Sequence, residues 1–136
     1  MEFQNNLTPC SKEALDYFKE HEKEINTEVM KQIKSGKNEL SFTGSNEKQK
    51  IMAGFQMVHS VLASIMQVGD TALLSDQLNW AKERLPHEGF DPKHVLNNFK
   101  IYFNVLKDVL PKIYADEILP YIKWIIEFQE TLIQQA

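Results

Sequence analysis

Cysteine, glycine and proline are all scarce in this 136-residue sequence, which has one cysteine, five glycines and five prolines. With Cys10 as its single cysteine, the chain cannot form an internal disulfide, and a reducing cytoplasm suits such a protein. The few glycines and prolines supply too few turns for an all-β architecture. These shortages favour a helical, disulfide-free domain.

The sequence also lacks a strongly basic cluster and a long apolar run. Its formal net charge is −4, whereas nucleic-acid binding requires a basic face. No apolar run reaches the roughly 18 residues that a transmembrane helix needs. Residues 1–6 are acidic and polar, unlike a signal peptide. We therefore expect a cytoplasmic protein that binds neither nucleic acid nor membrane.

Apolar residues recur every three or four positions along most of the chain, which predicts amphipathic helices. The predicted helices cover about residues 11–35, 46–68, 71–85, 92–110 and 112–133. Residues 1–10 are expected to be frayed, and residues 36–46 irregular. Because short links make successive helices antiparallel, the sequence predicts one all-α domain over residues 1–136, an antiparallel four- or five-helix bundle. A globin-like crossed-helix packing is the alternative.

Local signals mark several helix ends. Gly69-Asp70 ends one predicted helix and caps the next. Asp91 followed by Pro92 is a strong helix start, because the carboxylate accepts orphan N–H bonds and proline tolerates the first turn. Pro111 is expected to end the fourth helix. Pro120 lacks an N–H, so it is expected to begin a turn or to kink the last helix.

One histidine falls on a predicted core stripe and is the candidate for cofactor binding. His59 lies four residues after Phe55 and three before Leu62, and Met66 continues the same face. A buried imidazole can ligate a metal or haem iron, or it can be hydrogen-bonded inside the core. We assign His59, Phe55 and Met66 to a possible cofactor pocket. A tetrapyrrole ligated through His59 or His94 is possible, although no cofactor is required.

The remaining polar candidates cluster around the predicted connection before Asp91. His87, Glu88 and His94 could converge at one end of the bundle, but a zinc site needs three or four ligands in tight geometry. The sequence has no Glu-x-x-His pair, no glycine-rich phosphate loop and no nucleophile with an evident base. We therefore predict a protein that is not an enzyme, with a metal-dependent enzyme as a further alternative.

Aromatic residues stand on more than one side of the predicted helices. We assign Trp80, His87, Glu88, Tyr102 and Trp124 to a surface that binds a ligand or a protein partner, because large exposed apolar areas mark such sites. Self-association through the last two helices would make the protein a homodimer.

The stretch from Gly69 to Leu96 resembles the small helical domain found next to cobalamin-binding domains in bacterial sensor and regulatory proteins. The resemblance rests on Gly69-Asp70, Trp80, Gly89 and Pro92. It implies a signalling role by analogy with that family. The cobalamin-ligating pattern Asp-x-His-x-x-Gly is absent, so the resemblance does not extend to cobalamin binding.

Together these features predict a stand-alone regulatory or sensor-type helical domain. Such a domain would act by protein–protein interaction, by self-association, or by binding a small apolar ligand between its helices. A signal would then pass as a change in helix packing.

Overall fold

In the computed structural model, the described residues are 6–35, 45–84, 87 and 91–135. They form six α-helices: α1 (Lys12–Glu20), α2 (Glu22–Ser35), α3 (Ser45–Val68), α4 (Ala72–Arg84), α5 (Pro92–Val109) and α6 (Lys112–Gln135). No strand forms among these residues, which show a single isolated β-bridge between Asn6 and Asp70. The predicted all-α class is confirmed.

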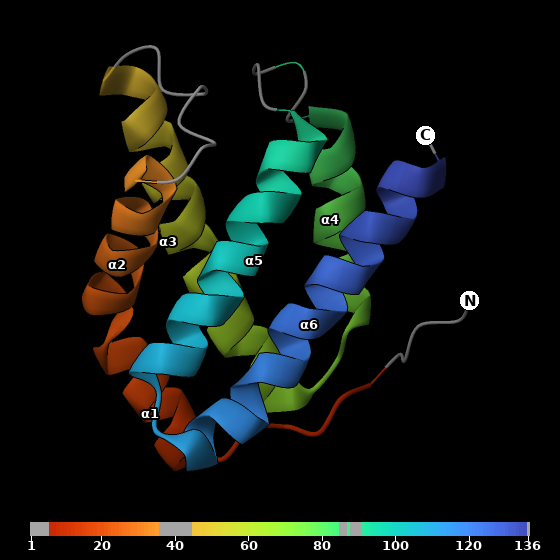
Figure 1. Cartoon of the computed structure of the whole chain (residues 1–136). Coiled ribbons are helices and arrows are strands. Elements are labelled where there is room, and N and C mark those ends of the chain that lie inside the picture. The colour runs from red at the N-terminus through yellow and green to blue at the C-terminus, as the bar shows by residue number, and fades with distance from the viewer. Residues whose placement is uncertain (1–5, 36–44, 85–86, 88–90, 136) are drawn as a thin grey trace.

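The helices pack as a bundle built around α5 and α6. These two helices meet at a sharp corner and run antiparallel, with α2 against α5 and α4 against α6 (Figure 1). Helix α3 packs on both α1 and α2 and passes behind α5 in Figure 1. No described helix is long and apolar enough to cross a membrane.

The helix ends follow the capping signals in the sequence. The side chain of Asp91 accepts a hydrogen bond from the backbone N–H of Lys93 at 2.9 Å, and Pro92 is the first residue of α5. Leu110 has an extended backbone, with ψ of 140°, as expected for a residue that precedes a proline. The predicted start of α5 and its end before Pro111 are confirmed.

The predicted first helix is in fact two helices, α1 and α2, which meet at His21. The His21 ring stacks on that of Tyr17, with centroids 3.8 Å apart. Its Nδ1 lies 2.9 Å from the carbonyl oxygen of Tyr17, to which the His21 backbone N–H also donates. At this point the backbone leaves helical geometry, with φ of −102° and ψ of 16° at His21. Apolar periodicity alone does not reveal such a break.

Of the two expectations for Pro120, a turn or a kink, the turn is wrong, because Pro120 lies inside the last helix. Helix α6 continues through it to Gln135. Pro120 is exposed, while its neighbours Ile118, Tyr121 and Ile122 are fully buried. Burial of apolar side chains on both sides of the proline offsets the backbone hydrogen bond that it removes.

Residues 6–10 are held against the bundle, whereas the sequence suggests that they are frayed. The backbone N–H groups of Leu7 and Cys10 donate to the carbonyl oxygens of Gly69 and Met66, at 2.9 and 2.8 Å. The hydroxyl of Tyr121 donates to the Thr8 carbonyl at 2.8 Å. Most of the predicted irregular stretch, 36–44, lies outside the described residues, and Ser45 already belongs to α3.

Candidate functional site

The three residues assigned to a cofactor pocket lie on one face of α3 and belong to the core. Phe55, His59 and Met66 are 6%, 2% and 0% exposed. Phe55 stacks against Tyr102 of α5 with ring centroids 5.4 Å apart. The His59 ring lies flat on Phe18 of α1, with centroids 3.7 Å apart and ring planes within 5°.

Both ring nitrogens of His59 have partners inside the core. Nε2 lies 2.7 Å from the carbonyl oxygen of Phe18, which can only accept, so Nε2 carries the hydrogen. Nδ1 lies 3.2 Å from the hydroxyl oxygen of Tyr102 and accepts its hydrogen. An imidazole satisfied on both sides ties α3 to α1 and α5. It could ligate iron only by giving up one of these bonds.

Burial keeps His59 and Tyr102 in their neutral forms. Desolvation lowers the pKa of His59, while its bond to the Phe18 carbonyl and the nearby Glu22 charge act in the opposite direction. Desolvation, together with Glu22, raises the pKa of Tyr102. At physiological pH both side chains are therefore neutral. This fits their hydrogen bond, in which the Tyr102 hydroxyl donates to Nδ1 of His59.

Tyr102 and Trp124 do not lie on a partner surface, which corrects the sequence assignment. Tyr102 is 0% exposed and Trp124 is 7% exposed. The Tyr102 hydroxyl is used by His59, and the Trp124 ring stacks on Phe128 with centroids 5.0 Å apart. Aromatic residues on several sides of a helix here reflect the packing of α5 and α6 against more than one neighbouring helix, which helical spacing alone does not show.

Trp80 and His87 are exposed, and their assignment to a binding surface stays a prediction. Trp80 is 55% exposed, and the guanidinium carbon of Arg84 lies 5.3 Å from its ring centroid. With Glu83 and Arg84, the two residues line a shallow depression of about 450 Å³. Glu88, assigned to the same surface, lies outside the described residues.

His94 lies in the first turn of α5, where its backbone N–H donates to the Asp91 carbonyl at 3.0 Å. Across the part of the chain that the structure describes, no group of three or more His, Cys, Asp or Glu side chains is placed to hold a metal ion. Because Glu88 lies outside the described residues, the metal alternative for His87, Glu88 and His94 stays a prediction.

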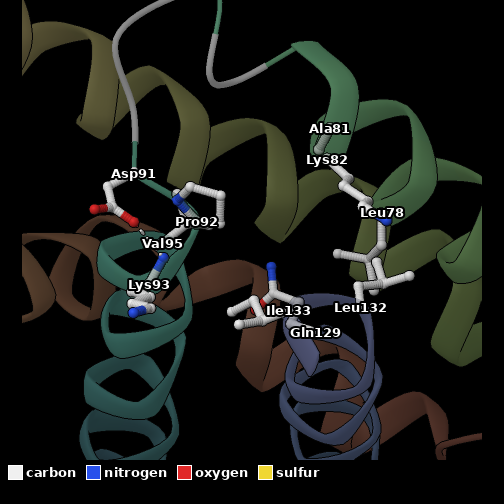
Figure 2. A pocket seen from close by; sticks show the side chains of 10 residues that line it. All are labelled: Leu78, Ala81, Lys82, Asp91, Pro92, Lys93, Val95, Gln129, Leu132 and Ile133. Atoms are coloured by element: carbon white, nitrogen blue, oxygen red, sulfur yellow. Dashed lines mark hydrogen bonds between the residues drawn. The ribbon is translucent and has the colours of Figure 1, made fainter. Parts of the chain in front are cut away.

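A separate hollow opens between α4, α5 and α6, and we take it as the candidate site. Its volume is about 380 Å³. The walls are mainly apolar, with Leu78 and Ala81 on α4, Pro92 and Val95 on α5, and Leu132 and Ile133 on α6 (Figure 2). Lys82, Asp91, Lys93 and Gln129 complete its lining. None of Phe55, His59 and Met66 lines this hollow.

Gln129 is the polar residue that distinguishes the hollow from ordinary core packing. Figure 2 shows its side chain rising from α6 into the space between Pro92 and the side chain of Leu78. Its Oε1 is buried and has no hydrogen-bond partner among the described residues. An unsatisfied buried oxygen costs about 1–3 kcal/mol, so the site carries an unused acceptor.

The sequence analysis does not single out Gln129, although a signal is present. Gln129 stands four residues after Ile125 and four before Ile133, so it interrupts the apolar stripe of the last helix. A polar residue on a buried stripe marks a special position. The opposite wall of the hollow comes from α4 and α5, which the sequence does not place against this residue.

Comparison with known proteins adds no family to this description: no protein-family model matches the sequence, and no curated protein matches it significantly. The resemblance to the domain that accompanies cobalamin-binding domains stays a prediction. The functional argument therefore depends on the geometry of the hollow and its lining.

Proposed function

We propose that this chain is a regulatory, sensor-type helical domain that works by binding a small apolar ligand between α4, α5 and α6, and not by catalysis. The observation that carries the proposal is the apolar hollow with an unpartnered Gln129 oxygen in its lining. Ligand sites are typically mostly apolar hollows of about 300–1,000 Å³ with a few polar groups that orient the ligand. The hollow matches this pattern in size and composition.

Three helices contribute to the walls, so a bound ligand would affect their relative packing. Helix α4 is joined to the bundle mainly through α6, where Leu74 and Leu78 are buried. A ligand between Leu78 and Leu132 would add contacts between α4 and α6. A ligand shifts the equilibrium between two arrangements of packed helices only if it binds one of them more tightly than the other. The contacts that this site offers depend on the position of α4, so they would differ between two such arrangements.

The outer face of α4 provides a surface through which a protein partner could recognise the altered packing of this helix. Leu73 and Trp80 are 53% and 55% exposed and stand seven positions apart, so they lie on the same side of the helix. In this proposal the ligand contacts the inner face of α4 and the protein partner binds its outer face. One helix then links the two binding events.

The proposal is tested with a small uncharged probe, 1-octanol, added to protein with isotopically labelled methyl groups. We expect the methyl signals of Leu78, Val95, Leu132 and Ile133 to shift in a saturable manner. The variant Leu132→Gln places a polar group in the α6 wall and is expected to weaken octanol binding by at least about 10-fold, the effect of roughly 1.4 kcal/mol.

The matched control is Leu73→Gln, which makes the same change on the exposed face of α4. It is expected to leave octanol affinity unchanged. Shifts spread evenly over the core and surface methyl groups, or equal losses in the two variants, would contradict a ligand site at this hollow. Circular dichroism of each variant verifies that the bundle is intact.

A further inference from the structure

We infer that the hollow between α4, α5 and α6 takes a neutral ligand whose apolar body ends in a carboxamide head, with an N–H group that donates to Oε1 of Gln129. This inference rests on the proposed function and adds the chemical class of the ligand. Three observations carry it: the unused oxygen of Gln129, the exposure of the charged residues in the lining, and the volume of the hollow.

The unpartnered oxygen of Gln129 decides what the head must supply. Oε1 is buried and accepts no hydrogen bond from a described residue, and an amide carbonyl oxygen can only accept. A ligand group that satisfies it must therefore carry an N–H or O–H hydrogen. The terminal torsion of a glutamine side chain is soft, so the amide can turn to present this oxygen to a ligand in the hollow.

The nitrogen of the same amide favours a head that also accepts a hydrogen bond. In Figure 2, the Gln129 nitrogen points into the space between Pro92 and Leu78. The Gln129 amide therefore offers an acceptor and N–H donors next to each other. A carboxamide has the same two functions side by side, so it can pair with Gln129 through two hydrogen bonds. A carboxylic acid is ionised at neutral pH and then has no donor.

The charged residues of the lining are all exposed to solvent, which favours a neutral head. They are Lys82, Asp91 and Lys93, whereas Leu78 is buried and Gln129 is partly buried. A charged head beside the buried Oε1 of Gln129 would lose its hydration without a buried counter-charge, which is costly. A neutral carboxamide avoids this cost and still supplies the donor.

The volume sets the size of the body. At roughly 30 Å³ for each water-sized group, a hollow of about 380 Å³ holds about a dozen non-hydrogen atoms. The walls offer aliphatic side chains from three helices, among them Leu78, Val95, Leu132 and Ile133. An alkyl chain of medium length that ends in a carboxamide matches both the volume and the lining.

The test compares three ligands that have the same alkyl chain and nearly the same shape: octanamide, 2-nonanone and octanoate. The amide carries an NH₂ group where the ketone has a methyl group and the carboxylate has a second oxygen, so only the amide donates. Each compound is titrated into protein with labelled methyl groups, and the shifts of Leu132 and Ile133 give its affinity. Because the ketone is less polar than the amide, the quantity to compare between protein variants is the ratio of their affinities.

Two variants locate the head. Gln129→Met keeps the length of the side chain and removes both hydrogen-bonding groups. It is expected to lower the affinity for octanamide relative to 2-nonanone by about 10-fold, the effect of losing hydrogen bonds to a buried amide. Gln134→Met makes the same change at an exposed position of α6 and is expected to leave the ratio unchanged. Octanoate is expected to bind the unaltered protein more weakly than octanamide, because its carboxylate cannot donate.

The outcomes separate this inference from the proposed function. A ratio that Gln129→Met leaves unchanged, or that Gln134→Met changes equally, overturns the carboxamide head and leaves an apolar site in place. Tighter binding of octanoate than of octanamide overturns the neutral head. Failure of all three compounds and of 1-octanol to shift the methyl signals of Leu132 and Ile133 overturns both the head group and the ligand site.

Discussion

The hydroxyl oxygen of Tyr102 lies 3.2 Å from Nδ1 of His59, and this contact joins α5 to α3 in the middle of the core. On the other side of the imidazole, Nε2 donates to the carbonyl oxygen of Phe18 in α1. One neutral histidine therefore connects three helices through directional bonds. Hydrogen bonds require specific donor–acceptor distances and angles, so these two bonds fix the positions of α1 and α5 relative to α3.

Removal of the Tyr102 hydroxyl is expected to destabilise the protein. Tyr102→Phe leaves Nδ1 of His59 as a buried acceptor without a donor, which should lower the free energy of unfolding by about 1–3 kcal/mol. Urea denaturation followed by circular dichroism measures the change. The control Tyr17→Phe alters a half-buried tyrosine and should change stability by less than about 0.5 kcal/mol. Equal effects of the two substitutions would show that the bond to His59 contributes nothing specific.

Stability is expected to fall in mild acid because of His59. Desolvation lowers the pKa of His59 below its usual value of 6.5, so the unfolded chain takes up a proton at a higher pH than the folded protein does. The contribution is complete above about pH 6.5 and is lost as the pH falls from there toward the folded pKa. The slope for one proton is limited to about 1.4 kcal/mol per pH unit.

Urea denaturation at about pH 7.5 and about pH 5.5 tests this expectation in the unaltered protein and in His59→Gln. The glutamine can still donate to the Phe18 carbonyl but does not titrate. The other three histidines are common to both proteins, so their contributions cancel in the comparison. We expect the unaltered protein to lose more stability between the two pH values. The same loss in both proteins would show that His59 is not the group responsible.

The parts of the fold that were predictable from sequence depend on residues close together in the chain. Asp91 and Pro92 place the start of α5 because the cap and the groups that it satisfies are two positions apart. Pro111 likewise acts on its immediate neighbour. The break at His21 cannot be predicted from sequence, because a histidine that bonds back to Tyr17 has no distinctive sequence pattern.

The candidate site was less predictable because it depends on contacts distant in sequence. Gln129 can be assigned to a site only once the structure shows that α6 lines the same hollow as Leu78 of α4 and Pro92 of α5. The conformation of residues 6–11 also depends on contacts that are distant in sequence. The Glu117 carboxylate accepts hydrogen bonds from the backbone N–H and the hydroxyl of Ser11, 106 positions away, at 2.6 and 3.0 Å. The sequence predicts that His59 lies on a core stripe, and its side chain is buried, but its hydrogen-bond partners cannot be predicted from the sequence.

Replacement of Asn26 by leucine is expected to stabilise the protein. Asn26 on α2 is 2% exposed, and neither polar atom of its side chain has a hydrogen-bond partner among the described residues. Asn26→Leu removes the cost of this buried amide while keeping the same number and branching of side-chain heavy atoms, and it should raise the free energy of unfolding by about 1–3 kcal/mol.

Denaturant unfolding measures the effect, with Asn104→Leu on the exposed side of α5 as the control that should change stability by less than about 0.5 kcal/mol. A loss of stability in Asn26→Leu would contradict the expectation. It would indicate that the amide has a hydrogen-bond partner in solution, such as a buried water.

Gly69 and Gly54 are expected to respond to alanine in opposite directions. Gly69 has φ of +86°, and a Cβ there would collide with the backbone carbonyl oxygen of Leu7, which packs across the end of α3. Gly54 lies within α3, and a Cβ there would meet nothing within 4 Å. Gly69→Ala therefore adds both backbone strain and a clash, with an expected loss of at least about 1–2 kcal/mol.

Gly54→Ala should instead raise the free energy of unfolding by about 0.5–1 kcal/mol, because alanine loses less conformational entropy than glycine in a helix. Amide hydrogen exchange adds a local measurement. The Leu7 amide, which donates to the Gly69 carbonyl, should lose protection in Gly69→Ala and keep it in Gly54→Ala. Unchanged protection of Leu7 in both variants would show that residues 6–10 do not depend on the close approach that glycine allows at position 69.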